Sequence, residues 1–208
     1  MDAKPVKFYF RAGNLALDFV NTVGNRLSET EWRDYFGSPD EFLRWVGEAG
    51  LSPLGKNGKK FIALRDVQRA IVFRESLYRL FLKEAQGKSP QPADLRCLNR
   101  ILAKHRSRME LARRNGGYEW RSGSSSSADW ILEQVAEAAA ALLTSAELAK
   151  LKICQNETCG WFFVDRSRNL PRRWCSMDDC GNLAKARRHY RRIKTAPGKS
   201  KKASSLLD

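Results

Sequence analysis

The stretch that decides the fold is Cys154-Gln-Asn-Glu-Thr-Cys159 and, after fifteen intervening residues, Cys175-Ser-Met-Asp-Asp-Cys180. Four residues separate the cysteines of each pair, and a loop this short can turn both thiolates toward one ion. A structural zinc site takes four soft ligands at the corners of a tetrahedron, so two such pairs fill it and leave no open position. We therefore predict one Zn²⁺ held by these four cysteines. Two disulfides, or four unrelated core cysteines, are the alternatives.

The rest of the chain favours the metal over disulfides. It carries no apolar secretion signal and no long apolar span. We therefore expect no membrane segment and a cytoplasmic location, where a reducing environment keeps cysteines available for metals. The two histidines, His105 and His189, do not improve on four thiolates as a ligand set.

The residues around the cysteines predict a small module. The run Gly160-Trp-Phe-Phe-Val164 is typical of a buried strand, and Leu170-Pro-Arg-Arg-Trp174 can return as its hairpin partner. The stretch from Gly181 to Lys194 then predicts a helix rich in Lys and Arg. Trp161 and Trp174 are expected to pack over the metal site, although either ring can also stack on an unpaired base.

These motifs resemble a known family. Cys154-x4-Cys159-Gly-Trp-Phe-Phe-Val-Asp-Arg-Ser-Arg-Asn, followed by Arg-Arg-Trp-Cys175-Ser-Met and Cys180-Gly-Asn, is similar to the CGNR-type zinc finger of bacterial transcription regulators. Leu183 stands where that family carries its eponymous arginine. Near the start, Gly13-Asn-Leu-Ala-Leu-Asp-Phe-Val-Asn-Thr22 resembles the beginning of the ABATE domain that usually precedes this finger. The resemblance implies a bacterial regulator whose first domain senses a small molecule or forms a homodimer.

The fold class predicted for the whole chain is mainly α with a small β component (α+β). Apolar residues at helical spacing predict helices over 15–25, from Ser38 onward, and over 61–85, 93–113 and 128–143. We place a helical ABATE-like domain at 1–150, the four-cysteine zinc module with its β-hairpin and basic helix at 151–195, and a disordered basic tail at 196–208.

One helix carries a polar stripe. Over 15–25, Asp18, Asn21 and Asn25 fall opposite an apolar face, and together with the family resemblance they predict a small-molecule pocket. A solvated helix face is the alternative.

Charge points to the partner. The chain has a net charge of +15, and residues 150–202 hold 15 Lys or Arg against 4 Asp or Glu. Such a concentration favours a polyanion, with double-stranded DNA first, over a merely solubilising tail. The predicted nucleic-acid contacts lie near the hairpin turn and along the basic helix: Arg166, Arg168, Arg172, Arg173, Lys185, Arg187, Arg188, Arg191, Arg192 and Lys194.

No pattern names a reaction. The chain has no glycine-rich phosphate loop, no Gly-x-Ser-x-Gly and no His-Glu-x-x-His, and a closed metal site does not activate water. We expect no catalytic residues. The sequence therefore predicts a zinc-dependent DNA-binding transcription regulator. An RNA-binding protein and a zinc-stapled protein-interaction module are the alternatives.

Overall fold

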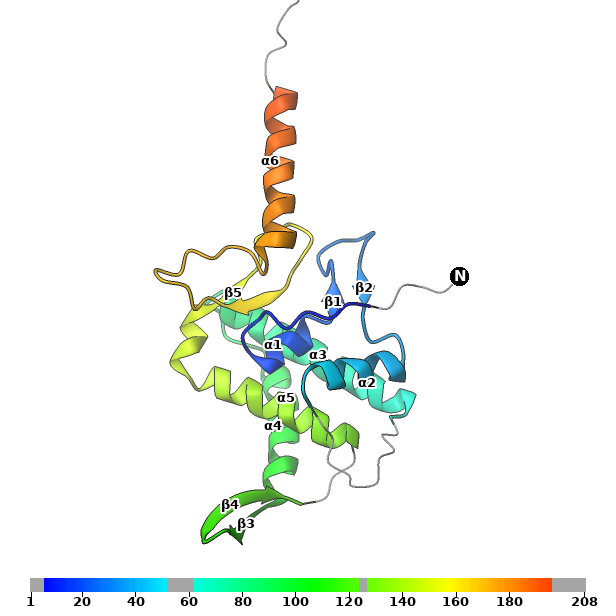
Figure 1. Cartoon of the computed structure of the whole chain (residues 1–208), viewed down its shortest axis with the longest axis vertical. Helices are drawn as coiled ribbons and strands as arrows, with labels where there is room; N and C mark the ends of the chain where they lie inside the picture. Colours follow the sequence, from blue (N-terminus) through cyan, green and yellow to red (C-terminus); the bar gives the residue numbers. More distant parts are fainter. Residues whose placement is uncertain (1–5, 52–61, 124–126, 196–208) are drawn as a thin grey trace, which may run out of the picture.

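Helix α1 (Leu15–Val20) lies at the centre of the structure (Figure 1). The computed structural model describes residues 6–51, 62–123 and 127–195, so the predicted tail at 196–208 lies outside the described residues. The Asn14 side chain accepts a hydrogen bond from the Ala16 N–H at 2.9 Å and caps the helix. Because α1 is apolar nearly all round, with Leu17, Phe19 and Val20 at most 1% exposed, it is buried by its neighbours on all sides.

Four longer helices surround α1. They are α2 (Pro39–Glu48), α3 (Leu64–Ala85), α4 (Pro92–Arg106) and α5 (Ser127–Leu143). The predicted helix start at Ser38 is confirmed, since its hydroxyl accepts from the Glu41 N–H at 3.2 Å. On α2, Trp45 packs edge-on against Phe19 with 5.4 Å between ring centroids. None of the described helices is long and apolar enough to cross a bilayer.

The β structure consists of three antiparallel strand pairs within the described residues. They are β1 (Val23–Gly24) with β2 (Arg33–Asp34), β3 (Met109–Arg114) with β4 (Gly117–Ser122), and β5 (Leu151–Ile153) with β6 (Phe162–Val164). A 3₁₀ turn, η1 (Ala146–Lys150), precedes β5, and a π turn, η2 (Met177–Gly181), leads into α6 (Asn182–Thr195). Hairpin β3–β4 and helix α6 lie at opposite ends of the molecule (Figure 1). The predicted α+β class is confirmed.

Two predicted helices were too long. The helix over 15–25 ends at Val20, because the next residues turn into β1 and Asn25 adopts a left-handed φ of 46°. The helix over 93–113 ends at Arg106, and Met109 opens a strand instead. Asn115 and Gly116 both have positive φ and form the hairpin turn that joins β3 to β4.

The predicted zinc-module hairpin pairs differently. Leu170–Trp174 forms no strand, and β6 pairs with β5, which precedes the first cysteine. The reason is the positive φ of Asn169 and Leu170, which turns the chain away from an extended return path. The strand pair therefore encloses the loop between Cys154 and Cys159 and not the loop between the two cysteine pairs.

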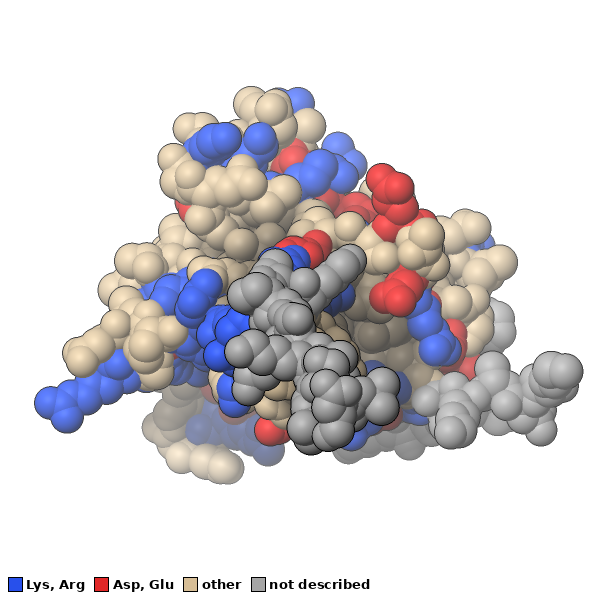
Figure 2. Space-filling model, turned by 90° about the horizontal axis from the view of Figure 1, so that it is seen from above, with Lys and Arg blue, Asp and Glu red and all other residues tan. Residues whose placement is uncertain are grey.

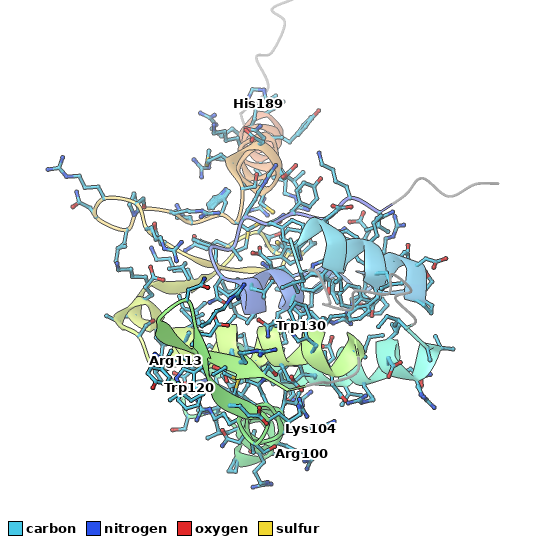
Figure 3. The ribbon with its side chains drawn as sticks, turned by 60° about the horizontal axis from the view of Figure 1, so that its bottom comes forward. Arg100, Lys104, Arg113, Trp120, Trp130 and His189 are labelled. Atoms are coloured by element: carbon cyan, nitrogen blue, oxygen red, sulfur yellow. The ribbon has the colours of Figure 1, made fainter. Side chains whose placement is uncertain are left out.

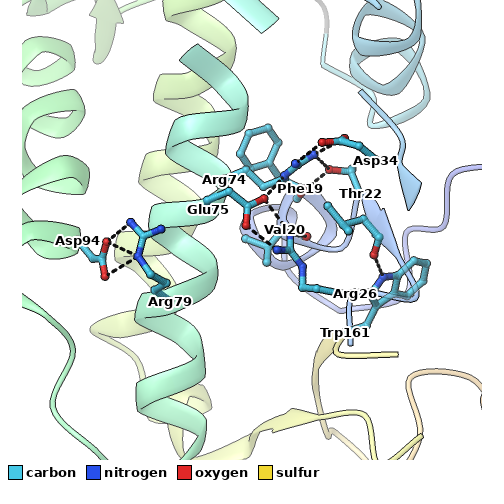
Figure 4. A network of polar contacts seen from close by, with 11 residues as sticks. Phe19, Val20, Thr22, Arg26, Asp34, Arg74, Glu75, Arg79, Asp94 and Trp161 are labelled. Atoms are coloured by element: carbon cyan, nitrogen blue, oxygen red, sulfur yellow. Dashed lines mark hydrogen bonds and ion pairs between the residues drawn. The ribbon is translucent and has the colours of Figure 1, made fainter. Parts of the chain in front are cut away.

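A buried charge network ties the β1–β2 segment to α3 (Figure 4). Arg74, only 1% exposed, donates to both carboxylate oxygens of Asp34 at 2.7 and 2.6 Å. Arg26 donates to Glu75 at 3.1 Å, and its guanidinium lies 4.0 Å from the centre of the Tyr78 ring. Burial acts to raise the pKa of Asp34, but the Arg74 hydrogen bonds and charge hold it below its usual value. The network fixes the loop that carries residues 25–32 beside the cysteines.

Candidate metal centre and basic surface

The four predicted metal-binding cysteines converge in one place. All four are buried, and their sulfur atoms lie within 4.8 Å of one another. The Sγ of Cys175 is 3.7 Å from that of Cys159 and 3.6 Å from that of Cys180. Four sulfurs at about 2.3 Å from one tetrahedral ion lie about 3.8 Å apart, so the spacing fits a closed thiolate site. None of the five cysteines forms a disulfide in the structure, which favours a metal over the predicted alternative of two disulfides.

Local backbone structure places each pair. The Cys154 N–H donates to the Trp161 carbonyl at 2.8 Å, and the Cys159 N–H donates to the Asn156 carbonyl at 3.0 Å. Gly160, with a φ of +72°, then turns the chain into β6. In the second pair, the Ser176 hydroxyl caps η2, which carries Cys180. The β5–β6 strand pair therefore positions the first cysteine pair, and the capped turn η2 positions the second.

Asn156 connects the cysteines to the basic helix. Its Nδ2 donates to the Cys180 sulfur at 3.3 Å, and its Oδ1 accepts from Arg187 at 3.0 Å. A donor to sulfur stabilises the thiolate form, so Asn156 supports a metal ligand and α6 together. Sequence reasoning missed this residue, since one asparagine inside a four-residue loop carries no distinctive signal.

Strand β6 separates two apolar clusters by the alternation of its side chains. Phe162 points into the helical core, where its ring lies 5.3 Å from Tyr78 and 6.2 Å from Phe81. Phe163 is fully buried among the four cysteines, with Trp161 and Trp174 packed alongside. The predicted packing of both tryptophans over the metal site is therefore confirmed.

Asp165 organises the loop that follows β6. It is fully buried and accepts from Lys152 Nζ at 2.7 Å, from the Arg172 N–H at 3.0 Å and from the Ser167 N–H at 3.1 Å. Burial acts to raise the pKa of Asp165, but the bonds from Lys152 and Ser167 hold it well below its usual value. Sequence reasoning treated this stretch only as turn-rich, because the partners come from separate segments.

The module is joined to the helical domain by more than chain connectivity. The Asn21 side chain donates to the Phe162 carbonyl and accepts from its N–H, each at 2.9 Å. Trp161 donates to the Val23 carbonyl at 2.6 Å, and Arg11 pairs with Asp179 at 3.0 Å. The zinc module is predicted to begin at residue 151, and apolar residues of β5 and β6 at its start pack into the helical core.

The predicted polar stripe does not form. Asp18 is buried and accepts from the Ala12 N–H at 3.0 Å, and burial raises its pKa to about 6. The Asn21 side chain is hydrogen-bonded to the backbone of Phe162 in β6. Asn25 lies beyond the helix end, exposed, beside a hollow of 200 Å³ that also borders Cys159, Cys175 and Cys180. The correction follows from the early end of α1, because residues beyond Val20 no longer share a helical face with Asp18.

Several of the arginines predicted to contact nucleic acid also form hydrogen bonds within the fold. Arg166 donates to both Glu147 carboxylate oxygens at 2.7 Å and to the Gly13 carbonyl at 3.0 Å. Arg172 donates to the Trp174 and Cys175 carbonyls and lies 4.3 Å from the Phe163 ring centre. Arg187 is half-buried and bonded to Asn156.

The remaining cations lie at the surface. Arg173 donates to Gln155 at 2.6 Å and covers Trp174, and Arg191 bonds Glu157 at 3.3 Å. The side chains of Arg168, Lys185, Arg188 and Arg192 are exposed, while that of Lys194 lies outside the described ones. In the view along α6, groups of Lys and Arg lie around the helix among residues of other kinds (Figure 2).

A groove of 440 Å³ runs between α6 and the loop before Cys175. Its floor is largely apolar and its rim is cationic. It is lined by Ser167, Pro171, Arg172, Arg173, Trp174, Met177, Gly181, Ala184, Lys185 and Arg188. No sequence pattern predicted it, because its two walls, residues 167–174 and 177–188, face each other only in the folded chain.

The fold and the site together define a class of protein, in which a helical domain ends in a four-cysteine zinc finger. A family model for the CGNR zinc finger matches residues 150–193. A model described as a putative stress-induced transcription regulator, ABATE, matches residues 13–146, more than half of the chain. The chain therefore belongs to the ABATE family and ends in a CGNR zinc finger. No match was found among functionally curated proteins.

Proposed function

We propose that this protein regulates transcription by binding double-stranded DNA through its zinc-fixed basic helix. The observation that carries the proposal is the position of α6, which starts at Asn182 directly after Cys180. A metal bound by the four cysteines holds the first turn of the helix in place. The cations beyond it then meet phosphates with little loss of conformational freedom.

Zinc is the metal that the ligand set favours. Four cysteine thiolates are soft ligands, and their fit to a tetrahedron is typical of structural zinc sites. Because such a site is closed, we propose that the metal is structural and that the protein is not an enzyme. Cysteine ligands must stay reduced, which supports our placing the protein in a bacterial cytoplasm.

The exposed cations of α6 supply a phosphate-binding face. Lys185, Arg188 and Arg192 recur at spacings of three and four residues, which places them on one side of a helix. Arg173 lines the groove together with Lys185 and Arg188 of this face. Arg187 and Arg191 are positioned by Asn156 and Glu157, so we assign them a smaller share of binding.

The salt dependence of binding tests the proposal. Each lost phosphate contact lowers the salt slope by roughly 0.9 on duplex DNA, so Arg188→Ala with Arg192→Ala should flatten it by nearly two. The matched control is Arg96→Ala with Arg100→Ala, since these two arginines are also exposed, lie four residues apart and sit on α4. The control should keep the slope of the parent protein.

Competition among three polyanions decides between the alternatives. Duplex DNA, structured RNA and heparin would be titrated against the zinc-loaded protein over a range of salt. Preference for duplex DNA at moderate salt supports the proposal. Tighter binding of RNA would favour the RNA-binding alternative, in which half-buried Trp174 stacks on an unpaired base. Equal slopes for the α6 variant and its parent would indicate that α6 contacts an acidic protein.

A second role, effector binding, is favoured by a hollow at the other end of the molecule. Its volume is 490 Å³, within the range of about 300–1,000 Å³ typical of small-molecule sites. It lies where hairpin β3–β4 meets α4 and α5, far from α6, as the labels of Trp120 and His189 show (Figure 3). It is lined by His105, Arg106, Met109, Trp120 and Glu137.

His105 gives the hollow a polar anchor. Its Nδ1 lies 3.2 Å from the carboxylate of Glu133, which is 1% exposed and also accepts from Arg108. A carboxylate paired with an arginine only accepts, so Nδ1 carries the proton and Nε2 is left to meet a ligand. Together with Trp120, this geometry suits a flat aromatic molecule bearing a hydrogen-bonding group.

A panel of phenols and aromatic carboxylates tests the effector role through shifts in Tm. Members that bind should raise Tm in the parent protein, and the shift should disappear in His105→Gln and in Trp120→Phe. Trp32→Phe is the control, because Trp32 is also exposed but does not line the hollow. Shifts that persist in both site variants would place the ligand elsewhere.

A further inference from the structure

The loop between β6 and η2 projects to one side of the base of α6 (Figure 1). At its middle lie Arg168, Asn169 and Leu170, which we call the loop tip, and all three are exposed. The Leu170 N–H donates to the Ser167 carbonyl at 3.2 Å and closes a four-residue turn. Asn169, with a φ of 63°, occupies the third position of this turn, where a type II turn needs a positive φ.

The fold holds this loop from both ends. Asp165 accepts from the Ser167 N–H at 3.1 Å and from the Arg172 N–H at 3.0 Å, so one buried carboxylate clamps its two sides. Lys152 donates to the Leu170 carbonyl, and to the Arg172 carbonyl at 3.3 Å. Leu170 is held at a φ of 51°, a left-handed conformation that is rare for a bulky side chain. Because the tip already has this shape, little conformational freedom is lost when it binds.

Arg168 is the cation that this loop leaves available. Arg166 is bound to Glu147, and Arg172 is bound to backbone carbonyls beside the second cysteine pair. The guanidinium of Arg168, in contrast, makes no hydrogen bond or ion pair with any described residue. A positive charge on a preformed turn can therefore meet an external partner without first breaking an internal contact.

The tip adjoins the groove that α6 helps to form. Ser167 and Pro171 flank the tip, and both line the groove of 440 Å³ together with Lys185 and Arg188. A duplex whose phosphates meet Lys185 and Arg188 therefore comes close to the loop tip as well.

The residue types of the tip match those that proteins use in the minor groove of DNA. Arg and Asn read the acceptor atoms of A·T base pairs there, and Leu or Pro wedges between base steps. The minor groove is about 6 Å wide, and in A·T-rich tracts it is narrower, with a more negative potential that attracts arginine. Contact with phosphates alone would give no role to Leu170, which is 39% exposed.

We propose that the loop tip enters the minor groove beside the DNA segment that α6 contacts, where the Arg168 guanidinium donates to adenine N3 and thymine O2. A·T pairs are favoured because the 2-amino group of guanine projects into the minor groove as a donor and opposes another donor. The inference rests on the proposed DNA binding and adds a base preference to it.

Replacing guanine by inosine tests which groove is read. An inosine–cytosine (I·C) pair presents the same major-groove groups as a G·C pair but lacks the 2-amino group in the minor groove. Alternating G·C and I·C duplexes of about 30 base pairs, roughly three helical turns, would be titrated with the full zinc-loaded chain. We expect the I·C duplex to be bound on the order of tenfold tighter, a ratio typical of one unfavourable base pair.

Two changes at Arg168 separate its shape from its charge. Arg168→Ala should bind the two duplexes equally. Arg168→Lys should recover affinity at low salt but little of the preference, because an ammonium group is more strongly hydrated than a guanidinium. The matched control is Arg188→Ala on α6, which should weaken binding to both duplexes by the same factor and keep the preference. Zinc content and circular dichroism check that each variant is folded.

The outcomes distinguish this inference from the proposed function. Equal binding of the two duplexes by the parent protein overturns the minor-groove contact and leaves DNA binding standing. A preference for I·C that persists in Arg168→Ala also overturns it, since another part of the protein would then read the minor groove. A protein that binds neither duplex at any salt concentration overturns both the inference and the proposed function.

Discussion

The two halves of the zinc module are held in different ways. The first half, from Leu151 to Val164, pairs its strands and inserts Phe162 into the helical core. The second half, from Cys175 to Thr195, is joined to the first mainly through the cysteine cluster and the Asn156 bonds. The first half of the module is therefore part of the core, whereas the second half is attached to its surface. We expect only the second half to depend strongly on the metal for its place.

Loss of a metal ligand should produce the largest effect. Cys175→Ser leaves three thiolates, and structural zinc in such modules contributes about 10–16 kcal/mol. We expect the second half to disorder and DNA binding to disappear, while circular dichroism keeps most of the helical signal. The reason is that α1 to α5 carry none of the four clustered cysteines.

Cys97→Ser is the control for this prediction. Cys97 is the fifth cysteine, half-buried on α4 and outside the cluster, so its loss should leave the metal content at one equivalent. A global loss of helicity in Cys175→Ser but not in Cys97→Ser would show that the metal supports the helical core as well.

The second-largest effect should come from replacing the two adjacent phenylalanines of β6. The two replacements should affect different halves of the module. Phe162→Ala removes a ring from the helical core and should cost about 3–5 kcal/mol in the free energy of unfolding measured with urea. Phe163→Ala makes the same change one residue along, but its ring lies among the cysteines. It should weaken metal retention against a chelator and change the urea midpoint of the helices less. If Phe162→Ala and Phe163→Ala changed metal retention and the urea midpoint equally, the division of the module into two halves would be wrong.

The pH dependence of stability should give the smallest effect and opposite signs in the two regions. Burial raises the pKa of Asp18 from its ordinary 3.8 to about 6. The folded state therefore holds a proton that the unfolded state releases, so the free energy of unfolding falls as pH rises from about 4 to 6. The loss is about 3 kcal/mol.

Asp18→Asn keeps the acceptor for Ala12 and should remove this slope. Asp165 behaves in the opposite sense, because its folded pKa is lowered. Its contribution is present above the unfolded pKa and is lost as the pH falls below about 4. Urea titrations between pH 3 and 7 measure both. An unchanged slope in Asp18→Asn would mean that another group titrates in this range.

Much of the fold was predictable because it rests on local patterns. The cysteine spacing indicated the site, the Ser38 cap marked a helix start, and apolar spacing located most of the helices. What failed depends on tertiary contacts. The pairing of β5 with β6 depends on the apolar surface of α3 and on the Asn21 side chain, neither of which is adjacent in sequence.

The basic surface shows the same limit. Composition indicated a cationic module, but it could not distinguish an arginine that faces solvent from one that braces the fold. Arg166 and Arg172 differ from Arg168 only in the carboxylate and carbonyl groups that the folded chain brings to them. The effector hollow likewise needed the turn at Asn115, since the hairpin brings Trp120 to the hollow that His105 also lines.

The hydrogen bonds between Asn21 and Phe162 have a consequence for protein synthesis. The two residues are 141 positions apart, and Arg11 pairs with Asp179 across 168 positions. The first helix to leave the ribosome therefore completes its contacts only after the last strand has emerged. Until then, the nascent chain exposes the apolar surface around Tyr78 and Phe81 that Phe162 covers. We therefore expect a chain terminated before residue 160 to leave this surface exposed and to be degraded faster in cells than the full chain.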